Sequence, residues 1–162
     1  VYLSPQGKRA DQKLINQLAQ ETGVIFVCGR YEGVDERFIQ RNVDVELSVG
    51  DFVVSGGELP ALLIMDAVVR QIPGAMNSQE SVECDSFMDG LLDCPHYTVP
   101  RDYQDAKVPE VLFSGNHEQI RKWRLQQSLW RTYQRRPELL QTRKLTKEES
   151  RLLSEMLAKS QD

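Results

Sequence analysis

In the first half of the chain, short apolar runs alternate with stretches of helical spacing. Residues 24–28 form a continuous apolar run rich in β-branched side chains, which predicts a strand buried on both faces of a parallel sheet. A second strand is predicted over 1–4, stopped by Pro5 and Gly7, and a third over 43–48, where apolar and acidic residues alternate. We therefore expect an α/β fold with a parallel sheet.

Three helices are predicted around these strands. The first follows Asp11, a residue suited to cap a helix N-terminus, and the second covers 35–42. The third is strongly apolar and covers 58–72, with Pro60 in its first turn and Pro73 just beyond its end. These elements complete the α/β part of the chain.

The second half of the chain begins with a stretch that lacks the regular hydrophobic spacing of the first half. Residues 75–115 are interrupted by prolines and glycines without sustained periodicity, which indicates a linker or lid. Helical spacing then returns, with a helix from Asn116 to about Arg135 and a final helix opened by a capping box of Thr146 and Glu149. We therefore divide the chain into an α/β domain (1–74), a linker (75–115) and a small all-helical domain (116–162).

Charge is unevenly distributed along the 162 residues. Segment 115–144 holds eight basic and two acidic residues and so carries +6, although the whole chain carries −4. Aromatic residues alternate with arginines over 120–125 and 129–136, a composition typical of RNA binding through phosphates and stacked bases. The alternative is that Trp123 and Leu125 face a helical core while the arginines are solvated.

Several protein classes are disfavoured by composition. The chain has no apolar run near the roughly 18 residues that a membrane span needs, and its start does not resemble a signal peptide. Cys28, Cys84 and Cys94 are odd in number and form no Cys-x-x-Cys pair, which indicates a reducing, cytoplasmic setting. The chain opens on apolar residues without Met, so we expect a fragment of a longer protein.

Two glycine-rich segments, 28–33 and 48–58, follow predicted strands. In open α/β sheets, ligands bind beyond the carboxyl ends of strands, and glycine lets the backbone approach them. Neither segment has a nucleotide phosphate-binding motif. Glu32, Asp51 and Glu58 make the segments acidic, which favours an uncharged or cationic cofactor over a polyphosphate. The alternative is that both segments are tight turns without a ligand.

Arg70 and Asp85 are candidate catalytic residues. Arg70 lies near the end of the apolar helix, where it could instead serve as a cation that complements the helix dipole. Asp85 recurs with Asp89 and Asp93 at intervals of four, a spacing that fits the solvated side of a short helix or a divalent-cation site. A carboxylate near a cofactor also suits a general base, with an arginine stabilising developing negative charge.

Seven motifs occur in one order, at 2–7, 28–37, 48–60, 85–87, 90–97, 114–117 and 135–140. Together they resemble the bacterial tRNA (guanine-N1)-methyltransferases of the SPOUT superfamily, which methylate the guanosine 3′ of the anticodon. The resemblance implies a parallel α/β sheet with a deep C-terminal trefoil knot, and a homodimer whose active site is shared across the interface. It further implies S-adenosylmethionine as cofactor, held by Tyr2, Leu3, Ser4, Pro5, Gly29, Tyr31, Glu32, Ser48, Val49, Gly50, Asp51, Phe52, Val53, Val54, Gly56, Gly57 and Pro60.

The same resemblance implies the catalytic roles. Asp85 matches the general base that takes the proton from guanine N1, Arg70 matches the arginine that stabilises charge on guanine O6, and Glu32 is the third catalytic candidate. The basic helical domain matches the part that grips the tRNA anticodon stem-loop, and Mg²⁺ assists the family's reaction.

The chain departs from the family pattern in three places. The family's opening third is not present, Phe52 stands in place of a tyrosine, and Val99 stands in place of an arginine. We expect the chain to keep the knot and bind cofactor but to methylate poorly or not at all. Two alternatives are a non-catalytic RNA-binding module and a scaffold that dimerises through the knot region.

Overall fold

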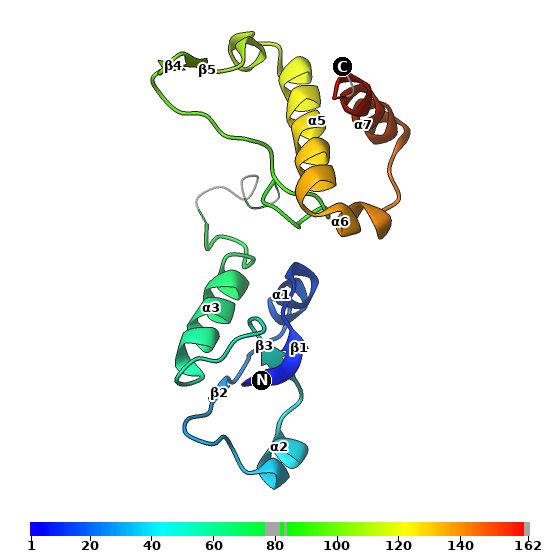
Figure 1. The fold of residues 1–162 in the computed structure, drawn as a ribbon. Helices are drawn as coiled ribbons and strands as arrows, with labels where there is room; N and C mark the ends of the chain where they lie inside the picture. Colours follow the sequence, from blue (N-terminus) through cyan, green and yellow to red (C-terminus); the bar gives the residue numbers. More distant parts are fainter. Residues whose placement is uncertain (77–81, 83, 161–162) are drawn as a thin grey trace. The chain divides into compact units, whose positions relative to one another are not determined.

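The computed structural model describes residues 1–76, 82 and 84–160, and the chain divides into two compact units (Figure 1). The first is Val1–Val82 and the second is Glu83–Asp162. Each has its own core and is described by itself. None of the described helices is both long enough and apolar enough to cross a lipid bilayer.

The first unit is built on three parallel strands, which confirms the predicted parallel α/β sheet. The strands are β1 (Tyr2–Arg9), β2 (Val27–Cys28) and β3 (Glu46–Ser48), and their order in the sheet is β2-β1-β3. Strand β1 is therefore the central strand and pairs with both of the others.

Strand β1 does not stop at Pro5 and Gly7, so the predicted end of this strand was wrong. Leu3 and Lys8 both lie opposite Leu47, which means that the residues between them leave the ladder before it resumes. Such a bulge accommodates a proline, which has no N–H to donate. Position 7 requires a glycine because β1 and β3 come close together there: a Cβ at this position would lie 2.5 Å from the backbone of β3.

The strand predicted over 24–28 is also shorter than expected. Only two of its residues form β2, at the edge of the sheet, and Ile25 is 82% exposed while Cys28 is exposed as well. Val24 and Phe26 pack partly against the core. The core covers one set of alternating side chains in this segment and leaves Ile25 exposed, so the expectation of burial on both faces was wrong.

The three predicted helices are present as α1 (Gln12–Leu18), α2 (Glu36–Asn42) and α3 (Glu58–Val69). Helix α1 is capped by Asp11, as predicted. Helix α3 ends three residues before Ile72, and the chain continues in tight turns toward a proline, which disfavours helical geometry in the residue before it.

Helices α1 and α3 contact each other and share one core with the sheet. Leu3 and Leu47 are partners on neighbouring strands, so their side chains point to the same face of the sheet. The buried residues of this core are Leu3, Ile15, Leu18, Leu47, Ala61 and Ile64. The core thus holds α1 and α3 against the sheet.

The second unit begins with a hairpin and continues in helices. Its elements are β4 (Asp102–Tyr103), β5 (Ala106–Lys107), the 3₁₀ helix η1 (Glu110–Phe113), α5 (His117–Arg135), α6 (Pro137–Gln141) and α7 (Lys147–Lys159). Helix α5 begins after Asn116, and the capping box of Thr146 and Glu149 opens α7, as predicted. The hairpin and η1 fall within the stretch that the sequence assigns to a linker.

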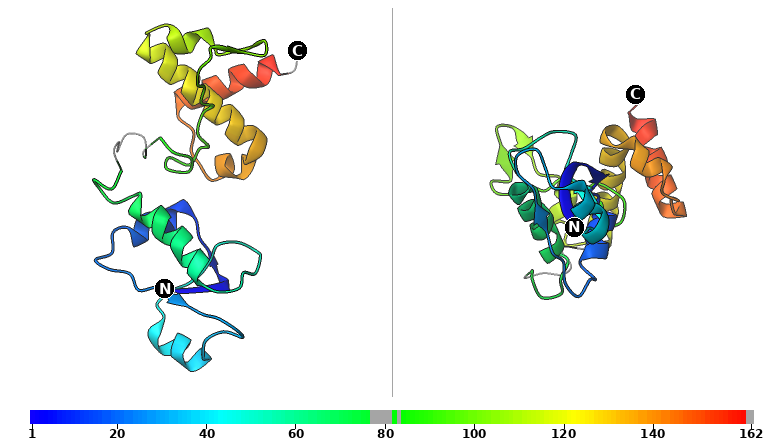
Figure 2. Two further views of the ribbon diagram at one scale, coloured as in Figure 1. Left: turned by 90° about the vertical axis from the view of Figure 1, so that its left-hand side faces the viewer. Right: turned by 90° about the horizontal axis from the view of Figure 1, so that it is seen from below.

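The core of the second unit lies between α5 and α7, which pack against each other (Figures 1 and 2). Leu91, Leu129 and Leu152 are its buried residues. Thr132 is fully buried; its hydroxyl donates to the carbonyl of Ser128 at 2.7 Å and accepts from the N–H of Leu92 at 2.9 Å. The segment around Leu91 is therefore part of this core.

Candidate functional site

A pocket of about 210 Å³ lies in the first unit, beyond the carboxyl ends of β2 and β3. Its walls come from three segments, 2–6, 29–33 and 47–60. Every residue of the cofactor set implied by the resemblance lines this pocket, with the exception of Asp51. The structure adds five lining residues that sequence reasoning missed, all from the same segments: Gln6, Arg30, Gly33, Leu47 and Ser55.

The two glycine-rich segments meet where Gly29 and Gly57 touch. The N–H of Gly57 donates to the carbonyl of Gly29 at 3.0 Å. A Cβ on Gly57 would lie 2.8 Å from the Cα of Cys28, and a Cβ on Gly29 would lie 2.9 Å from the phenol oxygen of Tyr2. Glycine at position 57 lets the two segments approach so closely, glycine at position 29 leaves room for the ring of Tyr2, and both residues line the pocket.

Buried hydroxyl groups hold the backbone at the strand ends. The Oγ of Ser48 donates to the carbonyl of Gly50 at 2.9 Å and accepts from its N–H at 3.1 Å. The Oγ of Ser4 accepts from the N–H of Gln6 at 3.2 Å. These bonds fix the bulge within β1 and the turn that leaves β3, so the pocket wall is held by local contacts.

Arg30 and Glu32 are the charged residues among those described around the pocket. The Nε of Arg30 lies 2.7 Å from a carboxylate oxygen of Glu58, at the start of α3, and this hydrogen bond lowers the pKa of Glu58 below its usual value. Within the described residues Glu32 forms no ion pair. The pocket therefore presents an uncompensated carboxylate and no lysine, which suits a cationic ligand.

Asp51 lies outside the pocket lining. Its carboxylate is 3.5 Å from the guanidinium of Arg9, and both side chains are mostly exposed. The three acids of the glycine segments thus have different surroundings, since Glu32 lines the pocket, Glu58 pairs with Arg30 and Asp51 faces solvent.

Backbone strain marks the rim of the pocket. Tyr31 is fully exposed and adopts φ of +58°, a left-handed conformation that is uncommon outside glycine. Phe52 and Val53 are also exposed, at 58% and 82%. Strained residues and exposed apolar side chains at a pocket are features typical of ligand-binding loops.

Arg70 and Asp85 lie in different units. Arg70 is the C-terminal capping residue of α3, and its N–H donates to the carbonyl of Asp66 at 3.1 Å. A cation in this position complements the helix dipole, and this contact is compatible with a second role. Asp85 is half-buried in a turn of the second unit.

Asp85, Asp89 and Asp93 lie in a series of turns, so the alternative of one solvated helix face was wrong. A carboxylate oxygen of Asp89 accepts from the N–H of Leu91 at 3.0 Å, and the N–H of Asp93 donates to the Oγ of Ser86 at 2.9 Å. These bonds hold the loop that carries Asp85 in a defined conformation.

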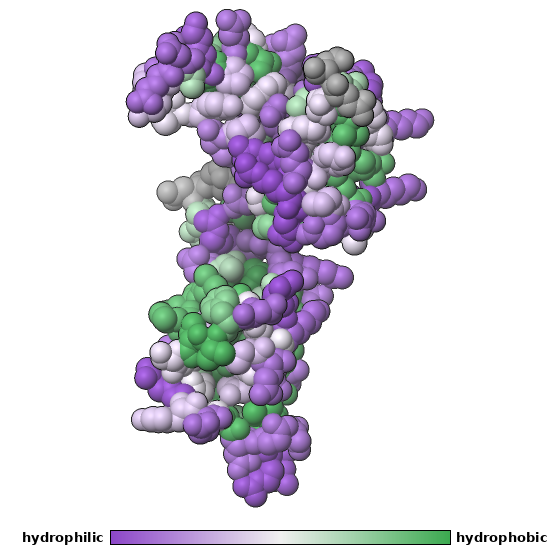
Figure 3. Space-filling view, in the orientation of Figure 1, coloured by the Kyte–Doolittle hydropathy of each residue, from purple (hydrophilic) through white to green (hydrophobic). Residues whose placement is uncertain are grey.

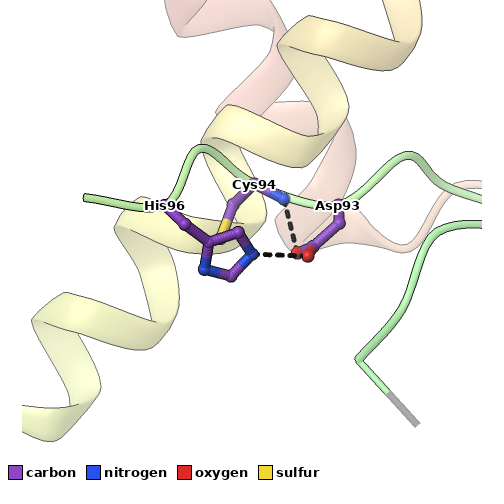
Figure 4. Close-up of side chains that lie close together, drawn as sticks. All are labelled: Asp93, Cys94 and His96. Carbon is purple, nitrogen blue, oxygen red and sulfur yellow. Dashed lines mark hydrogen bonds and ion pairs between the residues drawn. The ribbon is translucent and has the colours of Figure 1, made fainter. Parts of the chain in front are cut away.

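Asp93, Cys94 and His96 form a cluster whose potential ligand atoms all lie within 4.8 Å of one another (Figure 4). The carboxylate of Asp93 lies 2.6 Å from Nε2 of His96 and 2.6 Å from the N–H of Cys94. Burial alone would raise the pKa of Asp93, but these hydrogen bonds outweigh it and the pKa lies below its usual value. Burial raises the pKa of the Cys94 thiol. These groups satisfy one another by hydrogen bonds within the loop, and we assign no metal to this cluster.

Half of the basic residues of segment 115–144 are held in ion pairs. These pairs join Arg121 to Glu118 and Glu148, Lys122 to Glu118, Arg136 to Glu138, and Arg143 to Glu149. The hydrogen bond from Arg121 lowers the pKa of Glu118 to about 2. Within the described residues, the four basic side chains without an ion pair are Arg124, Arg131, Arg135 and Lys144. The charge available to an anionic partner is therefore smaller than the sequence suggests.

The alternative that Trp123 and Leu125 face the helical core is confirmed in part. Both are half-buried, and Leu125 packs against the cluster around Leu129. Arg124, between them, is exposed. Helix α5 thus packs on one side and presents cations on another.

A glycine-lined pocket at the carboxyl ends of parallel strands defines an α/β protein built to hold a small ligand. The chain matches the model of the family described as tRNA (Guanine-1)-methyltransferase TrmD over residues 1–142, and it belongs to this family.

Relatives named tRNA (guanine-N(1)-)-methyltransferase cover almost the whole chain. One from Pseudomonas syringae pv. tomato is 57% identical over 162 residues, and one from Chromobacterium violaceum is 63% identical over 155 residues. These alignments take in 100% and 96% of this chain but 65% and 61% of the relatives. The chain thus spans somewhat less than two thirds of their length.

Because Arg30 lowers the pKa of Glu58, this ion pair should be lost only at a pH below the usual pKa of a glutamate. A carboxyl group whose pKa is lower in the folded state stabilises the fold at neutral pH, and that stabilisation disappears as the pH falls through the folded pKa. We expect carbon-13 NMR to place the titration of Glu58 below 4.5 in the unmodified chain and to show it move up toward 4.5 in Arg30→Gln.

Glu118 is the internal control, because its pKa near 2 depends on Arg121 and should not respond to Arg30→Gln. A Glu58 titration that is the same with and without Arg30 would contradict the pairing.

Proposed function

We propose that this chain provides the cofactor pocket, the general base and the tRNA-binding helices of a tRNA (guanine-N1)-methyltransferase. The observation that carries the proposal is the pocket itself. It gathers, from three separate segments, sixteen of the seventeen residues named for the cofactor on sequence motifs alone, all but Asp51.

The pocket lining fits S-adenosylmethionine by its chemistry. This cofactor carries no phosphate, and its sulfonium supplies a methyl group to a nucleophile. The lining offers the carboxylate of Glu32 to a cation, while Arg30 is neutralised by Glu58. Five lining glycines, at 29, 33, 50, 56 and 57, leave backbone groups accessible to the edge of a purine. In this proposal residues 2–5, 29–32 and 48–60 hold the cofactor bent among the loops of a deep trefoil knot.

Asp85 acts as the general base in this proposal. Guanine N1 carries a proton and is a poor nucleophile until that proton is removed, so a carboxylate that accepts it increases the reactivity of the nitrogen. The loop that bears Asp85 is braced by the bond from Asp93 to Ser86, and Phe87 within it adopts a strained φ of +74°. A braced loop holds a base in place with little loss of entropy at reaction.

Arg70 and Glu32 complete the proposed catalytic set. When N1 loses its proton, negative charge develops on guanine O6, and a guanidinium that donates hydrogen bonds to this oxygen stabilises it. Arg70 has that role, and Glu32 stabilises the positive charge at the cofactor. Mg²⁺ would assist the same reaction. Of the cluster of Asp93, Cys94 and His96, only Asp93 offers the oxygen ligand that Mg²⁺ prefers, so we assign it no residue in the described part of the chain.

We further propose that the chain acts as a homodimer that buries one face of α3. This helix packs Pro60, Ala61 and Ile64 inward, while Leu59, Leu62 and Leu63 are 69%, 59% and 60% exposed. Figure 3 shows the apolar surface over α3. An exposed leucine face of this kind marks a protein interface. In the dimer each active site draws residues from both chains.

The substrate in this proposal is tRNA in the cytoplasm, methylated at the guanosine 3′ of the anticodon. The exposed cations of α5 and the residues after it would contact the anticodon stem-loop through phosphates. A non-catalytic RNA-binding and dimerisation role for the same chain remains the second candidate, because the chain covers only part of its relatives.

Asp85→Asn tests the proposed function directly. Loss of the base should lower transfer of a labelled methyl group from S-adenosylmethionine to tRNA by roughly 10²- to 10⁴-fold in single-turnover assays. The affinity for the cofactor, measured by calorimetry, should be unchanged. The matched control is Asp105→Asn, because Asp105 lies in the exposed hairpin turn and asparagine tolerates its positive φ.

Transfer to tRNA with adenosine in place of the target guanosine should be absent. Equal rates for Asp85→Asn and the unmodified chain would contradict the assignment, and absence of methyl transfer by the unmodified chain would favour the non-catalytic candidate.

Leu63→Glu tests the proposed dimer. A charge on the exposed face of α3 should shift the molar mass from dimer to monomer in sedimentation velocity at micromolar concentration, because burying an unpaired carboxylate is costly. Ile25→Glu is the matched control, since Ile25 is also apolar and exposed but belongs to the segment before β2 and not to α3. A monomeric unmodified chain would contradict the proposal.

A further inference from the structure

The second unit contains a pocket of its own, of about 470 Å³, which no step of the proposed reaction uses. We propose that it holds one unstacked nucleotide of single-stranded RNA, with the base against aromatic side chains and the phosphate against arginines. The inference rests on the proposed function only in taking RNA as the partner of this unit.

Three parts of the second unit form this pocket. Residues 95–101 make one wall, the segment from Val108 to η1 makes the second, and the first half of α5 makes the third. Figure 1 shows residues 95–101 leading to the hairpin β4–β5 and η1 leading back into α5. The volume lies within the range of small-ligand sites.

Aromatic rings are exposed to this pocket and yet held in place. Tyr97 and Phe113 line it and are 48% and 47% exposed. The ring of Tyr97 lies 6.3 Å from that of Trp123, tilted by 50°, which supports it from behind. An exposed ring fixed by a second ring is a suitable platform for stacking a base.

Cations lie beside these rings. The guanidinium of Arg101 lies 4.0 Å from the centroid of Phe113, and Arg124 lines the same pocket from α5. Neither arginine forms an ion pair with any residue that the structure describes. Asp93 holds the ring of His96 at the pocket through their 2.6 Å contact. These groups give the pocket donors for a phosphate.

No carboxylate is present among the residues that line this pocket, in contrast to the first pocket with Glu32. Planar rings beside arginines that pair with no carboxylate in the described part of the chain match a base and its phosphate, and α5 continues from Arg124 to Arg131 and Arg135. These are the features by which proteins bind unstacked RNA bases. An acidic peptide would use the arginines but would gain little from the rings.

The test compares two RNA probes: a hairpin with an unpaired loop, and a fully paired duplex of equal length. Tyr97→Leu should weaken binding of the hairpin roughly tenfold or more, because it removes one stacking platform, and should leave the duplex unaffected. Tyr97→Phe keeps the ring and should bind the hairpin as the unmodified chain does. Tyr103→Leu is the matched control, since Tyr103 is exposed on the hairpin β4–β5 and does not line the pocket.

A second variant tests the phosphate contact. Arg101→Gln should lower the slope of log affinity against log salt by about 0.7 for the hairpin, which corresponds to one phosphate of a single strand. Arg151→Gln is the control, because Arg151 lies on α7 in an i,i+4 pair with Glu155.

The inference is overturned if Tyr97→Leu binds the hairpin as tightly as the unmodified chain, if hairpin and duplex are weakened equally, if neither probe binds, or if an acidic peptide competes as well as the hairpin. Melting temperatures of all variants should agree within a few degrees, so that unfolding does not imitate the loss. Hairpin binding that depends on Tyr97 in a chain that transfers no methyl group would support this inference while contradicting the proposed reaction.

Discussion

The first pocket depends on one backbone contact, where the loop after β2 touches the start of α3. The N–H of Gly57 donates to the carbonyl of Gly29, and neither position has room for a Cβ. The contact brings together two segments that are distant in the chain, and the core behind it holds α3 against the sheet. Without it, the residues of the pocket would lie on separate loops with no shared cavity.

The two pockets have opposite electrostatic character, although they belong to the same chain. The pocket of the first unit offers a carboxylate and neutralises its arginine with Glu58, whereas the pocket of the second unit offers Arg101 and Arg124 with no lining carboxylate. A cationic small molecule and an anionic polymer would therefore bind at separate places. This division suits a reaction between a sulfonium donor and a nucleic acid, in which each substrate has its own electrostatic environment.

Sequence reasoning predicted the elements whose signals are local. The caps at Asp11, Asn116 and Thr146 and the helices they open were predicted because capping depends on a few neighbouring residues. The lengths of the strands were not, because pairing is decided by the partner strand, as in the bulge between Leu3 and Lys8.

The lining of the first pocket includes almost all of the residues that the family resemblance names for the cofactor, because those residues lie in three contiguous motifs. The second pocket could not be predicted, because Tyr97, Phe113 and Arg124 come from three elements that only tertiary packing brings together. The ion pair between Arg121 and Glu148 could not be predicted either, because it joins two helices, whereas the pairs of Glu118 with Arg121 and Lys122 have local helical spacing.

The most direct test of this account is the binding of S-adenosylmethionine to three forms of the chain, measured by titration calorimetry. The account predicts that the unmodified chain binds, that Gly57→Ala weakens binding about tenfold or more because its methyl group pushes the two loops apart, and that Gly23→Ala binds normally because that position is open. Absence of binding to the unmodified chain, or full affinity in Gly57→Ala, would contradict the claim that the contact between Gly29 and Gly57 forms the pocket.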